Sequence, residues 1–176
     1  LHDIPNTVMR AARGASALGA RLLTVHASGG RDMLAAGVDG AGDACGVLAV
    51  TVLTSLDRAS LSSAWGREVE SVPQEVLRLS DLARSASARG IVCAGSDAAT
   101  VRARHGDALE LLVPGIRLAG GDSHDQSRVS TPRAAIEAGA SYLVLGRAVT
   151  SATQPGEVLR RLRTEVAGVE RSRGAS

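Results

Sequence analysis

The stretch RLLTVHASGG, residues 21–30, joins a short aliphatic run to a cluster of small and polar residues. Aliphatic runs of about four to eight residues without strict alternation are typical of strands that are buried on both faces of a parallel sheet. Small and polar residues directly after such a run are typical of the loop that leads into a helix. The stretch therefore predicts a buried parallel strand followed by a loop and a helix.

The same pattern recurs along the chain. We predict five strands within the apolar runs 21–27, 46–53, 90–95, 109–116 and 141–149. Helical spacing of apolar residues occupies 6–18, 30–36, 73–88, 97–105, 131–138 and 156–171. Ser96 and Thr131 are expected to cap helices at their start, and Gly90 and Gly139 to lie where helices stop. This alternation indicates an α/β fold with a parallel sheet.

Two architectures place ligand sites at the carboxyl ends of parallel strands, the open doubly wound sheet and the (β/α)8 barrel. No GxGxxG motif follows a predicted strand, which disfavours a dinucleotide-binding open sheet. Barrels often bind phosphate with the loops after their last two strands, and here those strands lead into PGIR (114–117) and GR (146–147). The sequence therefore favours a TIM barrel.

Composition narrows the classes of function. The 176 residues carry a net charge of +2, which gives no electrostatic argument for nucleic acid or a membrane surface as a partner. Cys45 and Cys93 lie in apolar runs and are expected to be buried, reduced thiols of a cytoplasmic protein. All 20 basic residues are arginine, so the chain has no ammonium side chain for proton transfer or Schiff-base chemistry.

Several side chains at predicted strand ends could bind a ligand. Arg117 and Arg147 carry guanidinium groups suited to phosphate, Gly146 offers a backbone N–H, and Gln126 offers an amide. An ordinary solvated loop is the alternative for 113–132. The hydroxyls of Thr51, Thr54 and Ser55 could bind a base or sugar, or cap a following helix, and their spacing does not separate the two. His26 is expected to be a structural histidine, and the spacing of His2, His105 and His124 does not indicate a metal site.

Six segments, taken in order, closely resemble the orotidine 5′-monophosphate decarboxylase family. They are HDIPNTV (2–8), VHASGG (25–30), LAVTVLTS (48–55), PGIR (114–117), DSHDQSRVSTP (122–132) and LGRAV (145–149). The resemblance implies decarboxylation of orotidine 5′-monophosphate to uridine 5′-monophosphate in pyrimidine biosynthesis, without metal or cofactor. It also implies that residues 1–176 are the carboxyl-terminal part of one TIM-barrel domain, a partial barrel of about the last five strands.

The resemblance assigns roles to residues near the start of the chain. Asp3 matches the last aspartate of the family's Asp-x-Lys-x-x-Asp motif and is the expected catalytic residue, with the motif's lysine expected just before Leu1. In the family, the residues that match Asp3, Ile4 and Thr7 reach into the neighbouring subunit's site, so a homodimer with shared sites is expected. Without the lysine, residues 1–176 are expected to be inactive alone. Five strands of an eight-stranded barrel also leave two open sheet edges, so we expect the chain to fold poorly or to associate.

Other matches concern the substrate. Thr54 matches a hydroxyl that bonds the pyrimidine, and Pro114 lines the pocket near the base. Gln126, Gly146 and Arg147 match the phosphate grip, with Arg117 close by, and 118–125 resembles a lid. Two alternatives stay open: a magnesium-dependent sugar-phosphate decarboxylase of the same superfamily, and a non-catalytic nucleotide-binding module.

Overall fold

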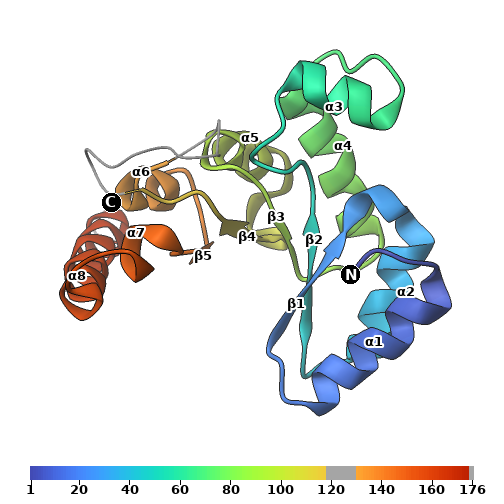
Figure 1. The fold of residues 1–176 in the computed structure, drawn as a ribbon, viewed down its shortest axis with the longest axis horizontal. Helices are drawn as coiled ribbons and strands as arrows, with labels where there is room; N and C mark the ends of the chain where they lie inside the picture. The colour runs from blue at the N-terminus through green and yellow to red at the C-terminus, as the bar shows by residue number, and fades with distance from the viewer. Residues whose placement is uncertain (118–129, 175–176) are drawn as a thin grey trace.

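The computed structural model describes residues 1–117 and 130–174, with side chains described up to residue 169. Its centre is a parallel sheet of five strands in sequential order (Figure 1). The strands are β1 (Leu22–His26), β2 (Gly46–Val50), β3 (Gly90–Val92), β4 (Glu110–Val113) and β5 (Tyr142–Leu143). All four neighbouring pairs are parallel, which confirms the predicted sheet, and β1 and β5 are its two edges.

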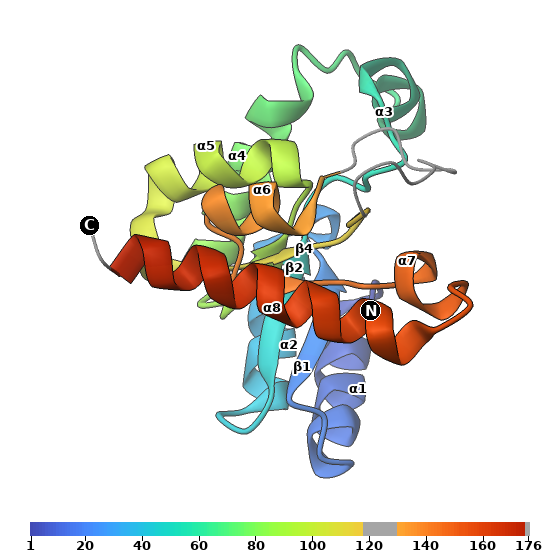
Figure 2. The ribbon, with the colours of Figure 1, turned by 90° about the vertical axis from the view of Figure 1, so that its left-hand side faces the viewer.

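Helices follow the strands, as predicted. They are α1 (Pro5–Ala17), α2 (Arg31–Ala41), α3 (Arg58–Trp65), α4 (Val72–Ser85), α5 (Gly95–His105), α6 (Pro132–Glu137), α7 (Arg147–Thr150) and α8 (Pro155–Gly174), with short 3₁₀ turns η1 (Ala27–Gly29) and η2 (Gly106–Ala108). Figure 2 shows α8 running along one side of the molecule and α3 standing at one end.

The two faces of the sheet differ in burial. Val25, Ala49, Ile91 and Leu111 are register partners across four strands, and all are inaccessible to solvent. They share one core with helix residues such as Leu79. The next row of register partners lies on the opposite face and is only half-buried: His26, Val50, Val92, Leu112 and Tyr142. The expectation of strands buried on both faces is therefore confirmed only in part, because Leu48 of β2 is also inaccessible on this second face while the row that ends the strands is half-buried.

Three helices differ from the sequence prediction in their extent or in their presence. α2 continues to Ala41, beyond the predicted end at residue 36. α3 was not predicted: of its side chains only Leu61 is buried, so the segment has little apolar periodicity. It begins instead at a polar cap, where the Asp57 carboxylate accepts from the Ser60 amide over 2.8 Å. α7 starts inside the predicted strand 141–149, because the strand ends at Leu143.

Two of the four predicted helix boundaries are confirmed. Thr131 caps α6, its hydroxyl oxygen accepting from the Ala134 amide over 3.2 Å, and Gly139 has a φ of 101° in the turn from α6 to β5. The prediction for Ser96 is wrong, because α5 begins at Gly95 and no side chain caps it. Gly90 does not end a helix but opens β3.

The first residue of the chain pairs with the outer side of β1. The Leu1 amino group donates to the Thr24 carbonyl over 2.7 Å, and the His26 amide donates to the Leu1 carbonyl over 2.9 Å. Two bonds from one residue to positions on either side of Val25 are the pattern of a parallel ladder. Leu1 therefore lies beside β1, and Asp3 lies at the carboxyl end of that strand.

Candidate functional site

The predicted site residues follow the strands along the carboxyl edge, the side of the sheet at which its parallel strands end. Asp3 lies beyond the end of β1, and Thr54 follows β2. Pro114 and Arg117 follow β4, and Arg147 follows β5. Because all five strands are parallel, these segments form a row along the carboxyl edge, with β1 and β5 at its two ends (Figure 1). This is the edge at which parallel α/β folds place their ligand sites.

An open cleft of about 520 Å³ surrounds Asp3. Its lining residues are His2, Asp3, Ile4, Pro5 and Gly29. Asp3 is exposed, and its Oδ1 accepts from the Ile4 amide over 2.7 Å. Ile4 is 66 % exposed although it is a large apolar residue, and Thr7 is exposed in the first turn of α1. A carboxylate and an apolar side chain therefore face open space together.

His26, the last residue of β1, contacts His2, which lines this cleft. The two imidazole rings are stacked, with centroids 5.4 Å apart and planes at 25°. Partial burial, the neighbouring His2 ring and the nearby terminal amino group all lower the pKa of His26. His26 is thus favoured in its neutral form, packed at a strand end as expected for a structural histidine.

The hydroxyl groups after β2 differ in their surroundings. Thr51 is buried, and its Oγ1 donates to the Val92 carbonyl over 2.7 Å. Thr54 lies half-buried in a turn and Ser55 is exposed. Helix α3 is capped by Asp57, so capping does not account for Thr54 or Ser55. Thr54 thus lies in the turn that follows β2, whereas the Thr51 hydroxyl binds the sheet.

The segment after β4 turns sharply and then pairs with residue 130. Gly115 has a φ of 75°, which favours glycine. The Arg117 amide donates to the Ser130 carbonyl over 2.9 Å, and the Ser130 amide donates to the Gly115 carbonyl over 3.2 Å. The ends of the intervening segment are therefore held together beside Pro114. Gln126 and the predicted lid 118–125 lie outside the described residues.

Gly146 and Arg147 form the start of α7. Gly146 occupies the N-cap position, and its carbonyl accepts from the amides of Val149 and Thr150 over 2.9 and 3.1 Å. Arg147, the first residue of the helix, is exposed. A guanidinium group beside an N-terminal turn of backbone amides favours an anion.

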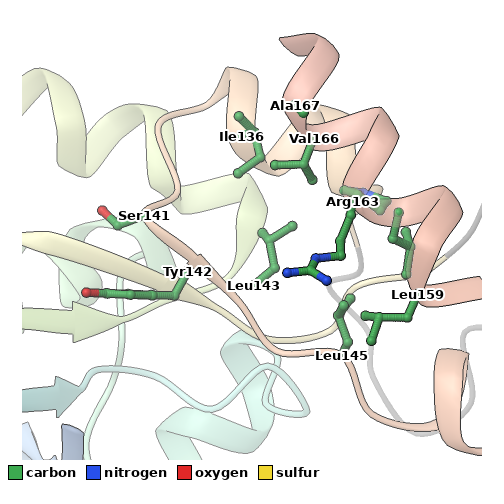
Figure 3. Close-up of a pocket in the computed structure, with 11 residues that line it drawn as sticks. Ile136, Ser141, Tyr142, Leu143, Leu145, Leu159, Arg163, Val166 and Ala167 are labelled. Atoms are coloured by element: carbon green, nitrogen blue, oxygen red, sulfur yellow. The ribbon is translucent and has the colours of Figure 1, made fainter. Parts of the chain in front are cut away.

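An apolar cavity of about 400 Å³ lies elsewhere, between β5, α6 and α8 (Figure 3). Figure 3 shows Leu143, Leu145 and Leu159 gathered around the Arg163 side chain, while Tyr142 extends away from α8. The Tyr142 hydroxyl donates to Glu110 over 3.0 Å. None of the predicted site residues in the described part of the chain lines this cavity, so it belongs to the packing of α8 rather than to the row of polar groups.

Residues 1–162 match the family described as "Orotidine 5′-phosphate decarboxylase / HUMPS family". The chain belongs to this family. It is 51 % identical over 161 residues to the orotidine 5′-phosphate decarboxylase of Anaeromyxobacter sp. (strain K), covering 91 % of this chain and 70 % of that protein. It is 47 % identical over 166 residues to the enzyme of the same name from Thermobifida fusca, covering 94 % and 70 %.

Solved structures of orotidine 5′-phosphate decarboxylases share the fold. The enzyme from Lactobacillus acidophilus superimposes with a TM-score of 0.82 at 32 % identity, covering 94 % of this chain and 72 % of that chain. The enzyme from Pyrococcus horikoshii OT3 gives a TM-score of 0.71 at 26 % identity, covering 96 % and 72 %. The unclosed five-stranded sheet is thus consistent with part of a TIM barrel, as predicted.

Neither a metal cluster nor a membrane-spanning helix is present among the described residues of this decarboxylase-family chain. No group of three or more His, Cys, Asp or Glu side chains among them lies close enough together to hold a metal ion. None of the helices within the described ranges combines the length and apolar character that crossing a bilayer requires.

Proposed function

We propose that this chain carries the nucleotide-binding part of an orotidine 5′-phosphate decarboxylase, which releases CO₂ from orotidine 5′-monophosphate to give uridine 5′-monophosphate (UMP). The observation that carries the proposal is the row of family-matching residues on one sheet edge, in a chain 51 % identical to a decarboxylase of that name. The sugar-phosphate and non-catalytic alternatives gain no support from these relatives.

The proposed site divides the substrate between separate segments. Arg147, the Gly146 backbone and Arg117 bind the phosphate together with Gln126. Thr54 bonds the pyrimidine edge and Pro114 lines the pocket beside it. Phosphate binding lies far from the bond that breaks, so its energy serves to hold the base against the reacting groups.

Charge placement accounts for the proposed chemistry. Loss of CO₂ leaves carbanion character at C6 of the pyrimidine, and a fixed array of charges stabilises a charge that develops there. Asp3 supplies one carboxylate of this array. The 176 residues contain no lysine to protonate C6, so we propose that they do not turn over substrate alone. No metal or organic cofactor takes part in the proposed reaction.

The proposal extends to assembly and location. Ile4 and Thr7 are exposed beside Asp3, where they are available to a second subunit, and we propose a homodimer with shared sites. Cys45 and Cys93 are buried free thiols, which suits a reducing cytoplasmic environment.

Calorimetric titration with UMP, the unreactive product, tests the proposal. Arg147→Ala should weaken UMP binding at least about tenfold, because one charge-assisted contact to phosphate is lost. Arg133→Ala is the matched control, since Arg133 is an exposed arginine that pairs with Glu137 on α6. If wild-type protein does not bind UMP, or if the two variants bind it equally, the proposed phosphate site is wrong.

A further inference from the structure

We propose that His26 is a positioning residue for Asp3 and acts through the ring of His2. The inference rests on the proposed function, in which the Asp3 carboxylate faces the reacting nucleotide. It adds a residue of β1 that does not itself contact the substrate.

The backbone contacts hold residue 1 but not residue 3. Leu1 is bound on both sides, to Thr24 over 2.7 Å and to His26 over 2.9 Å. The hydrogen bond of Asp3 runs from the Ile4 amide, its own chain neighbour, over 2.7 Å. That local bond shapes the Asp3 side chain but does not tie it to the sheet. On the other side of Asp3, Ile4 is fixed as the N-cap of α1, where its carbonyl accepts from the Thr7 and Val8 amides. The path of the chain between these two anchors therefore depends on what holds residue 2.

Residue 2 is held by packing of its ring. The His2 imidazole stacks on the imidazole of His26 at 5.4 Å, in the offset range that aromatic pairs favour. The His2 ring also packs close to the backbone of Gly29, because a Cβ built on Gly29 would lie 3.1 Å from His2 Cδ2. His26 is the last residue of the edge strand β1, and Gly29 lies in η1, the turn that directly follows this strand. The His2 ring is thus the link between a rigid strand and the segment that carries Asp3.

The stack also sets the direction of Asp3 relative to the cleft. His2, Asp3 and Gly29 line the same open space of about 520 Å³. If His2 rotates away from His26, residues 2 and 3 shift together between the Leu1 and Ile4 anchors, and the carboxylate moves relative to the row of segments at the carboxyl edge. A ring at position 26 therefore determines where the carboxylate points.

Nuclear magnetic resonance of the 176-residue chain tests the inference with three variants. His26→Ala removes the ring, and His26→Phe keeps a flat ring that can stack. Val25→Ala is the matched control, because Val25 is the inaccessible neighbour on the opposite face of β1 and its truncation weakens the fold without touching His2. The readouts are the Ile4 amide shift and its hydrogen-exchange rate, which report the Asp3–Ile4 hydrogen bond, with UMP affinity measured in parallel.

We expect His26→Ala to move the Ile4 amide shift and to raise its exchange about fivefold, the effect of weakening one hydrogen bond. His26→Phe should restore both values, and Val25→Ala should leave the Ile4 shift unchanged. An unchanged Ile4 amide in His26→Ala, or equal changes in Val25→Ala, would overturn the inference. The UMP affinity tests the proposed function separately. If wild-type protein does not bind UMP, the proposed function is contradicted, and the Ile4 amide still tests the role of His26.

Discussion

The Val92 carbonyl of β3 accepts two hydrogen bonds from Thr51, one from the hydroxyl over 2.7 Å and one from the amide over 3.1 Å. Thr51 thereby extends the contact between β2 and β3 beyond the last strand residue, Val50. Thr54 lies in a turn three residues after Thr51, so the chain that leads into this turn starts from a fixed point.

Thr51 and Thr54 are therefore expected to respond differently to the same substitution. Thr51→Val removes a buried hydroxyl bond and should lower the free energy of unfolding by about 1 kcal/mol, with UMP affinity little changed. Thr54→Val should weaken UMP binding more than Thr51→Val does. Urea unfolding and calorimetry on both variants measure the two quantities. Loss of affinity in Thr51→Val at temperatures where it is folded would contradict this division of roles.

Glu75 is expected to contribute to stability through two arginines. It is 8 % exposed and accepts from Arg67 over 2.7 Å and from Arg78 over 2.8 Å. Burial raises the pKa of Glu75, but the hydrogen bonds from Arg78 and Arg67 outweigh it, and the net pKa lies below the ordinary value. Its contribution is therefore present above the ordinary carboxyl pKa of about 4.3 and is lost as pH falls through the lower folded value.

Glu75→Gln should lower the free energy of unfolding at pH 7 by about 1–2 kcal/mol, a reduced figure because both arginines are about half exposed. The loss of stability in acid should also become shallower. Glu137→Gln is the control, since its pair with Arg133 is exposed and should contribute at most about 0.5 kcal/mol. Equal losses in the two variants, measured by denaturant unfolding, would show that burial of Glu75 adds nothing.

His105 links α5 to α4 in its neutral form. Its Nε2 lies 2.8 Å from the Ser80 hydroxyl, which itself donates to the Leu77 carbonyl over 2.7 Å. A hydroxyl has one hydrogen, so Nε2 carries the proton of this pair. Burial is the largest influence and lowers the pKa of His105, Arg104 and Arg84 lower it further, and Asp81, 3.5 Å from Nε2, partly offsets them.

Stability should therefore fall in mild acid. The lowered pKa means that the unfolded chain binds a proton first, so stability is complete above about pH 6.5 and decreases as pH falls through the folded pKa. Between pH 7.5 and 5.5, the unfolding free energy of wild-type protein should drop more than that of His105→Gln. Part of the drop should remain in the variant, because the pKa of His26 is lowered as well. Identical drops in both proteins would exclude His105 as a source.

Two glycine substitutions should act in opposite directions. A Cβ on Gly95 would lie 2.5 Å from the Ser130 Cβ, so Gly95→Ala should push residue 130 away from Arg117, destabilise the fold and weaken UMP binding. Gly14 is exposed in α1 with nothing within 4 Å of its Cβ position, and Gly14→Ala should stabilise by about 0.5–1 kcal/mol. Thermal unfolding of both variants checks the signs, and a stabilising Gly95→Ala would refute the close packing.

The elements that could be predicted from the sequence are those with strong local signals. Aliphatic runs located all five strands, and the Thr131-Pro132 pair located the start of α6. The misses have local causes too. Helix α3 lacks an apolar stripe and begins at the Asp57 cap. The run 141–149 continues apolar past Leu143, although only one further bond to β4 follows, from the Val144 amide to the Val113 carbonyl over 3.0 Å.

The candidate site divides in the same way. The six ordered segments from HDIPNTV to LGRAV were enough to indicate the family. A parallel sheet brings the ends of successive strands to one edge, so their shared location could also be predicted. That Thr51 binds the sheet could not be predicted, since Thr51 and Thr54 both follow the same strand and the sequence does not show that the Val92 carbonyl of β3 lies within reach of Thr51.

By itself, the amino-acid sequence determined the parallel α/β architecture, the family, and the absence of lysine from these 176 residues, because each depends on residue identity and spacing along the chain. Only the tertiary structure decided which rows of strand residues are buried and that Thr51 binds Val92. It alone brought His2 onto His26 beside Asp3. These contacts join residues from separate strands and turns, and their distances depend on packing that no local pattern encodes.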